Sequence, residues 1–231
     1  MSVIEFRGVT LREGAKLLLS GFDLALGAGE RLVVFGASGS GKSDFLKLAA
    51  GVASPASGAV VLLGPALARP APVGYVPNQG GLINNLTLAQ NVALPALYHK
   101  LLPAREAEAR SRAFLAELGQ SDEAERRPAM ASAAARRMAQ LARALLVEPA
   151  LFVLEHPLED MDSRNARLIS GTLERIRSDA NACAILGTRK LGPYLEWGSR
   201  FLLLSEGGFK IYADKAQLLR EEDQAVKVFL Q

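Results

Sequence analysis

The sequence predicts an α/β fold with a mainly parallel sheet, an antiparallel β element near the N-terminus and a helical insertion. Short apolar runs alternate with segments of helical periodicity over much of the 231 residues, which is typical of a parallel sheet flanked by helices. In the first quarter the apolar runs follow one another with no helical segment between them, as antiparallel strands do. The stretch 84–146 contains no convincing strand and is expected to be helical.

Short runs rich in aliphatic and aromatic residues mark the expected strands. They are SVIEFR (2–7), RLVVF (31–35), VVLL (60–63), VGYV (73–76), LFVL (151–154), CAIL (183–186) and RFLLL (200–204). Helical periodicity marks the expected helices, which span 42–50, 103–118, 136–146 and 163–177. We expect one domain over 1–231, in which 1–83 and 147–231 form the α/β core and 84–146 a mainly helical subdomain.

The charge of the chain argues against a dedicated nucleic-acid surface. There are 27 Lys and Arg residues against 24 Asp and Glu, which gives a formal net charge of +3. The pairs Arg126-Arg127 and Arg136-Arg137 have no aromatic residues between them and are expected to be solvated or to interact with helix ends. We therefore expect no nucleic-acid partner.

The composition also indicates the environment of the protein. Cys183 is the only cysteine, which excludes an internal disulfide framework and suits a reducing compartment. Because it opens an apolar run, we expect its thiol to be buried. The start MSVIEFRGVT carries charges and lacks the apolar core of a signal peptide.

A charge-poor segment covers 48–99, where Arg69 is the only ionised residue. Prolines, glycines and asparagines interrupt it, and no run approaches the roughly 18–20 continuous apolar residues of a membrane-spanning helix. The sequence therefore predicts a soluble chain with an uncharged middle.

The motif GASGSGKS at 36–43 carries the chemistry. It has the form G-x-x-x-x-G-K-[ST], follows the apolar run 31–35 and opens an expected helix. Glycines let successive backbone N–H groups turn toward phosphate oxygens, and a helix N-terminus adds positive potential. We expect the lysine at the β- and γ-phosphates and the final serine at Mg²⁺. The residues predicted to bind nucleotide here are Gly36, Ala37, Ser38, Gly39, Ser40, Gly41, Lys42, Ser43 and Asp44.

The motifs after this loop resemble those of the ATP-binding subunits of ABC transporters, over essentially the whole chain. GYVPNQ ends in Gln79, ARALLVEPALFVLEHP supplies a helix, a turn and a strand ending in Glu155, and EDMD and ILGTRK follow. A P-loop kinase or GTPase lacks this spacing.

The resemblance implies a P-loop NTPase core of ABC type that binds ATP and Mg²⁺. It implies that Gln79 touches the metal and senses the transporter, that Leu151–Glu155 is the Walker B strand, and that Met161-Asp162 ends the D-loop. Ser43, Gln79 and Glu155 would hold the metal, Glu155 through water.

Some positions depart from the pattern of this family. Where the family reads L-S-G-G-Q, this chain has Ala131-Ser132-Ala133-Ala134-Ala135, which keeps Ser132 as a nucleotide contact but replaces both glycines. His156 follows Glu155 in place of the carboxylate that polarises the attacking water. An imidazole is able to act as a base, but a neighbouring nucleotide favours its protonated form, which blocks that role.

Two further departures concern the phosphate and the base. Arg189 stands in place of the switch histidine; it is either a charge that holds the γ-phosphate without relaying protons, or a solvated surface residue. The segment 9–16 lacks the aromatic residue that stacks on adenine, which leaves Leu11 or Arg12 to cover the base. Groups that bind phosphate are thus kept while groups that complete hydrolysis are changed. His156 and Arg189 remain the catalytic candidates, and hydrolysis is expected to be weakened or lost.

Within the family, GGLINNLTLAQNVALPALYH (80–99) and the ending VKVFLQ (226–231) look most like the ATPases of MCE-associated (Mla-type) phospholipid transporters. This resemblance implies a membrane permease that docks on 79–99, an MCE-domain protein as a further partner, and a cytoplasmic location, peripheral on the inner face of the cell membrane. An uncharged docking segment suits such an interface. Two alternatives remain: an ATP-binding subunit that hydrolyses ATP slowly at best, or a non-catalytic regulatory or structural subunit that pairs with a competent ABC ATPase. The chain is expected to form either a homodimer or a heterodimer with another ABC ATPase.

Overall fold

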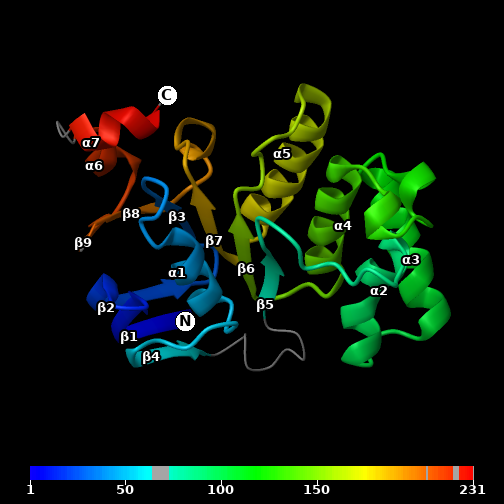
Figure 1. Cartoon of the computed structure of the whole chain (residues 1–231), viewed down its shortest axis with the longest axis horizontal. Helices are drawn as coiled ribbons and strands as arrows, with labels where there is room; N and C mark the ends of the chain where they lie inside the picture. The colour runs from blue at the N-terminus through cyan, green and yellow to red at the C-terminus, as the bar shows by residue number, and fades with distance from the viewer. Residues whose placement is uncertain (64–72, 207, 221–223, 231) are drawn as a thin grey trace.

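Two β-sheets with helices packed around them organise the part of the chain that the structure describes (Figure 1). This computed structural model describes residues 1–63, 73–206, 208–220 and 224–230. One sheet has three strands and the other six. A hydrophobic cluster that includes Phe6, Phe22 and Phe45 joins the smaller sheet to the first helix.

The antiparallel element near the N-terminus is confirmed. Its strands are β1 (Ser2–Glu13), β2 (Lys16–Gly27) and β4 (Ser57–Leu62), in the order β2-β1-β4. β1 extends well beyond the expected strand 2–7, through positions where its register with β2 shifts. β2 was not among the expected strands, because Ser20 and Gly21 interrupt its apolar run.

The larger sheet is mainly parallel, as expected, with the order β5-β6-β7-β3-β8-β9. Its strands are β3 (Arg31–Phe35), β5 (Val73–Val76), β6 (Leu151–Glu155), β7 (Cys183–Thr188), β8 (Arg200–Ser205) and β9 (Gly208–Tyr212). β6 and β7 are buried at every residue, which explains why they appear in the sequence as continuous apolar runs. β9 pairs antiparallel with β8 and was not expected.

Helices surround the larger sheet and fill the stretch between β5 and β6. They are α1 (Lys42–Ala49), α2 (Leu88–Tyr98), α3 (Ala104–Glu117), α4 (Ala133–Leu146), α5 (Ser163–Ser178), α6 (Lys215–Leu219) and α7 (Gln224–Lys227). Short 3-10 turns cover Ser121–Glu123, Pro128–Met130, Gly192–Tyr194 and Val228–Leu230.

The stretch 84–146 contains no strand, as expected, and its helices α2, α3 and α4 contact one another (green in Figure 1). α4 begins at Ala133 and not at residue 136, because the Ser132 hydroxyl caps it by accepting a hydrogen bond from the Ala135 backbone N at 3.1 Å. The division into core and subdomain after residues 83 and 146 stays a prediction.

The parallel strands determine where a site can form. The carboxyl ends of such strands lie at one edge of the sheet, so the loops that follow β3, β6 and β7 meet there. These loops lead to Lys42, His156 and Arg189. In the described ranges, no helix is both long enough and apolar enough to cross a membrane.

Candidate nucleotide-binding site

Glycines at positive φ shape the loop between β3 and α1. Gly36, Gly39 and Gly41 have φ of 154°, 75° and 90°. A Cβ at Gly36 would lie 2.2 Å from the carbonyl oxygen of Leu204, and one at Gly41 would lie 3.0 Å from a side-chain carbon of Leu18. The loop conformation therefore requires glycine at these two positions.

Lys42 opens α1 and folds back over this loop. Its Nζ donates to the carbonyl oxygens of Gly36 at 2.8 Å and Ala37 at 2.6 Å, and lies 3.4 Å from Ser40 Oγ. Burial, reinforced by the nearby charge of Arg189, lowers the pKa of Lys42 to about 8. The ammonium group is thus held within the loop that would surround a phosphate.

A cavity of about 320 Å³ lies against the loop, and we call it the Lys42 cavity. It is lined by Glu13, Ser38, Gly39, Gly41, Lys42, Ser43, Asp44, Lys47, Asn78, His156 and Arg189. Most of the predicted loop residues line it, whereas Gly36, Ala37 and Ser40 contact the ammonium group of Lys42. The cavity also gathers residues that follow β5, β6 and β7, as the sheet topology requires.

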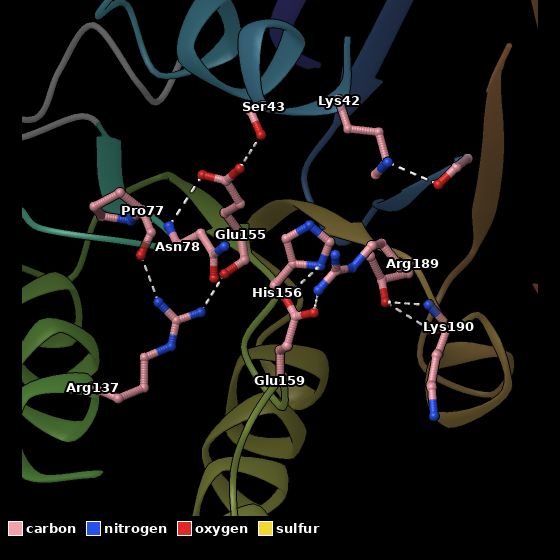
Figure 2. Close-up of polar contacts among 12 residues, drawn as sticks. Lys42, Ser43, Pro77, Asn78, Arg137, Glu155, His156, Glu159, Arg189 and Lys190 are labelled. Carbon is pink, nitrogen blue, oxygen red and sulfur yellow. Dashed lines mark hydrogen bonds and ion pairs between the residues drawn. The ribbon is translucent and has the colours of Figure 1, made fainter. Parts of the chain in front are cut away.

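Ser43 and Glu155 meet beside this cavity. The Ser43 hydroxyl donates to Glu155 Oε1, and the Asn78 backbone N donates to Glu155 Oε2 at 3.1 Å (Figure 2). Hydroxyl and carboxylate oxygens are ligands that Mg²⁺ accepts, and Mg²⁺ usually completes its shell with phosphates and water. Among the described residues, no group of three or more His, Cys, Asp or Glu is placed to hold a metal by itself. These residues therefore fit a metal that arrives with its nucleotide.

Gln79 and Ser132 lie apart from the other predicted ligands. Gln79 is exposed and lines a neighbouring cavity of about 360 Å³, which we call the Gln79 cavity. The residue before it, Asn78, lines the Lys42 cavity and was missed in the sequence. Ser132 caps α4 and lines neither cavity, although Ala133 lines the Gln79 cavity.

His156 and Arg189 both reach the Lys42 cavity, and both contact Glu159. His156 Nδ1 lies 3.5 Å from Glu159 Oε2, and Arg189 Nη2 forms an ion pair with Glu159 Oε1 (Figure 2). Burial lowers the pKa of His156 to about 4, and the positive charges of Lys42 and Arg189 act in the same direction. The imidazole is therefore neutral at pH 7 in the nucleotide-free chain, whereas the sequence argument for a protonated imidazole concerned the nucleotide-bound state. Glu159 was also missed in the sequence.

α4 holds the segment after β5 through Arg137, Gln140 and Arg143, which we call the α4 clamp. Arg137 donates to the carbonyl oxygens of Pro77 at 2.5 Å and of Glu155 (Figure 2), while Gln140 and Arg143 donate to the carbonyl oxygens of Gly80 and Gly81. Arg137 is only 6% exposed, so the expectation that it is solvated is wrong. The available signal was the spacing of these three polar residues, which recur every third position along α4.

The segment expected to cover the base differs from the expectation. Leu11 is 5% exposed and packs in the core between the sheets, so it is not placed to cover a base. Arg12 is exposed and does not line the Lys42 cavity; its Nη1 lies 3.5 Å from the carbonyl oxygen of Ala15. Glu13 is the residue of this segment that lines the cavity.

Comparison with known proteins agrees with this geometry. The family described as ABC transporter matches residues 19–159. The chain is 31% identical over 207 residues to the lipoprotein-releasing system ATP-binding protein LolD of Psychrobacter arcticus, which covers 84% of this chain and 90% of that protein. It is 32% identical over 209 residues to the aliphatic sulfonates import ATP-binding protein SsuB 1 of Paraburkholderia xenovorans, with 88% and 58% covered.

The fold agrees as well. A solved ATP-binding cassette, dimeric and in a post-hydrolysis state bound to ADP and Pi, matches with a TM-score of 0.80 at 23% identity, over 91% of this chain and 98% of that one. The loop, the strand order and the sequence relatives lead to one conclusion: this chain belongs to the ABC transporter family, as an ATP-binding subunit.

Proposed function

We propose that the chain binds Mg-ATP in the Lys42 cavity and hydrolyses it slowly or not at all, as part of a membrane transporter. The observation that carries this proposal is the place of His156, which directly follows Glu155 and lines the cavity. In the family this position supplies the carboxylate that polarises the attacking water. A buried neutral imidazole brings no negative charge to such a water molecule.

The other residues around the cavity are arranged to bind the phosphates and Mg²⁺ of Mg-ATP. Lys42 would exchange its loop carbonyls for the β- and γ-phosphates, and the glycine loop would offer its backbone N–H groups to them. Ser43 would ligate Mg²⁺ directly and Glu155 would do so through water, with Gln79 approaching from the neighbouring cavity. Held by these residues, Mg²⁺ would neutralise part of the phosphate charge. Arg189 would add a second positive charge near the terminal phosphate.

We propose that a membrane permease docks on 79–99, which places the chain on the cytoplasmic face of the cell membrane. Within this segment Ile83 is 42%, Leu97 36% and Tyr98 78% exposed. Large exposed apolar side chains in a segment without charges suit a protein interface.

We propose a lipid or lipid-anchored molecule as the cargo, with a phospholipid first. The amino-acid sequence of 80–99 and 226–231, which resembles that of Mla-type ATPases, favours phospholipid transport and an MCE-domain partner. Gln231 lies outside the described residues. The relative LolD belongs to a lipoprotein-releasing system, and both kinds of cargo carry acyl chains. Measuring the transfer of labelled phospholipid and of labelled lipoprotein by the reconstituted complex distinguishes the two kinds of cargo.

The test is phosphate release by the purified chain, alone and with its permease. We expect turnover well below roughly 1 s⁻¹, and a gain of about tenfold or more in the triple variant His156→Glu, Ala133→Gly, Ala134→Gly. Adding Lys42→Ala to the triple variant should remove the gain. Wild-type turnover of about 1 s⁻¹ or faster that Lys42→Ala abolishes would contradict weakened hydrolysis.

A second candidate is a non-catalytic subunit paired with a competent ABC ATPase. The observation in its favour is the N-terminus of α4, where exposed Ala133 stands at a glycine position of the family pattern. Each nucleotide in such a dimer lies between one P-loop and the other subunit's α4, so only one of the two sites would face these alanines. In this case Lys42→Ala in the present chain would weaken assembly but leave most turnover of the mixed complex.

A further inference from the structure

Glu159 connects the two catalytic candidates although it does not line the Lys42 cavity itself. One carboxylate oxygen, Oε1, is paired with the guanidinium of Arg189, and the other, Oε2, is buried without a hydrogen-bond partner 3.5 Å from His156 Nδ1 (Figure 2). The side chain is 20% exposed, whereas that of Arg189 is 51% exposed. The carboxylate is thus the fixed member of the pair.

The backbone after β6 places Glu159 there. His156 has a φ of 47°, and its carbonyl oxygen accepts a hydrogen bond from the Glu159 backbone N at 3.1 Å. This tight turn returns Glu159 to the side of His156. On the other side, Thr188 Oγ1 accepts from the Lys190 backbone N at 3.0 Å, which fixes the turn that carries Arg189. Both partners therefore sit on constrained turns.

Arg189 both lines the Lys42 cavity and contacts Glu159. Its charge contributes to the lowered pKa of Lys42, so the guanidinium lies within electrostatic range of the ammonium group. In the nucleotide-free chain the same guanidinium is paired with Glu159. A guanidinium binds carboxylate and phosphate oxygens through the same N–H donors. A terminal phosphate in the cavity and the Glu159 carboxylate therefore compete for one cation.

We propose that Glu159 is a specificity-determining residue, which competes with the terminal phosphate for Arg189 and so sets how strongly the site distinguishes a nucleoside triphosphate from a diphosphate. The inference rests on the proposed function, because it assumes nucleotide in the Lys42 cavity. A diphosphate leaves the pair of Glu159 and Arg189 intact, whereas a triphosphate must separate it. Separation leaves a half-buried carboxylate without its cation, so the segment between β6 and α5 has to rearrange when a triphosphate binds.

The experiment measures dissociation constants of Mg-ADP and of a non-hydrolysable Mg-ATP analogue by calorimetry. The proteins are the wild type, Glu159→Gln, Arg189→Gln and the double variant. We expect Glu159→Gln to tighten the triphosphate analogue about five- to tenfold and to change ADP less than about twofold. In the Arg189→Gln background, Glu159→Gln should have no effect on either ligand, because the competition has been removed.

A matched control is Glu117→Gln, which removes an exposed Glu–Arg pair with Arg175 on the surface of α3 and α5 and should leave both constants unchanged. Equal shifts for both nucleotides, no shift for either, or a shift that persists without Arg189 would overturn the inference. Loss of ADP binding in Lys42→Ala checks the proposed function separately. If the wild type binds neither nucleotide in a Lys42-dependent way, the proposed function and this inference both fail.

Discussion

His156 shows how backbone and environment together define one residue of the site. Its φ of 47° lies in the left-handed region that residues other than glycine adopt rarely, and its backbone N donates to the Gly187 carbonyl oxygen at 2.8 Å. The turn is thus set by main-chain contacts, and the side chain lies between Glu159 and the Lys42 cavity. A carboxylate in its place would be repelled by that of Glu159, and the positive charge of Arg189, which is paired with Glu159, offsets this repulsion. Any gain in turnover from His156→Glu therefore requires that Arg189 be kept.

Cys183 gives a prediction at the same scale. Its thiol is buried as expected, and burial raises its pKa to about 12 from an ordinary value near 9. Because the thiolate is the reactive form, the native protein at pH 7–10 should be alkylated by iodoacetamide far more slowly than the urea-unfolded chain, whose rate rises as the pH approaches 9. Mass spectrometry of the single adduct measures both rates. Similar rates over this range would contradict the burial of the thiol.

Site residues that belong to a local sequence motif could be predicted from the sequence, whereas site residues outside such motifs could not. Lys42 and Ser43 belong to one motif, and Glu155 ends an apolar strand, so the sequence alone identified these three residues as candidate ligands. Asn78 and Glu159 act through turns that bring them against residues far away in the chain. Their side chains carry no signal of their own, because an isolated Asn or Glu in a loop is most often solvated.

At the scale of elements, α4 joins two parts of the site. Its N-terminus carries the capping Ser132 and the exposed Ala133, and the α4 clamp ties its middle to the backbone of 77–81 and to the end of β6. Arg137 bonds at once to Pro77 and to Glu155, which are the points where β5 and β6 leave the sheet. The clamp therefore fixes the position of Asn78, and with it the backbone amide that holds Glu155.

The clamp predicts a large stability difference between two arginines. Arg137→Ala removes the donor from two main-chain oxygens, one of them in a buried residue, and should lower the free energy of unfolding by about 2–4 kcal/mol. Arg110→Ala is the matched control: it removes an exposed pair with Glu106 on α3 and should cost less than about 0.5 kcal/mol. Urea unfolding measures both. Equal costs would mean that Arg137 is dispensable for the fold.

The elements themselves were predicted unevenly for a physical reason. Strands buried on both faces, such as β6 and β7, are continuous apolar runs and were found. β2 alternates buried and exposed residues around a polar interruption, and β9 is short and half exposed, so neither produced such a run. α2 was missed as a separate helix because it is apolar on most sides, although the spacing of Thr87 and Gln90, which form a capping box, was a signal of its start.

At the scale of the whole molecule, the site is a set of adjoining cavities around one side chain. His156 lines the Lys42 cavity, the Gln79 cavity and a third cavity of about 370 Å³ that Glu159 and Tyr194 also line. The first is formed by the glycine loop and α1, and the second reaches the N-terminus of α4. A nucleotide in one cavity is therefore close to the surface through which α4 would meet another subunit.

That arrangement predicts how the whole molecule assembles. In a homodimer of the kind that the family resemblance implies, the N-terminus of α4 in each subunit would face the nucleotide of the other, and the methyl groups of Ala133 and Ala134 would hold the phosphate away from the backbone amides of the helix. Mg-ATP should therefore drive homodimerisation of the wild type weakly. We expect the variant Ala133→Gly, Ala134→Gly to dimerise about tenfold more tightly with a non-hydrolysable analogue, as measured by sedimentation velocity.

Two controls make this prediction sharp. Ala113→Gly places glycine on the exposed face of α3. It should lower helix stability as the double-glycine variant does, but it should not increase the affinity of the dimer. Adding Lys42→Ala should remove the gain, because the dimer would then lack its bridging nucleotide. If the double-glycine variant and the wild type dimerise equally with the analogue, the alanines are not the barrier, and the heterodimer with a competent ATPase becomes the better account of this chain.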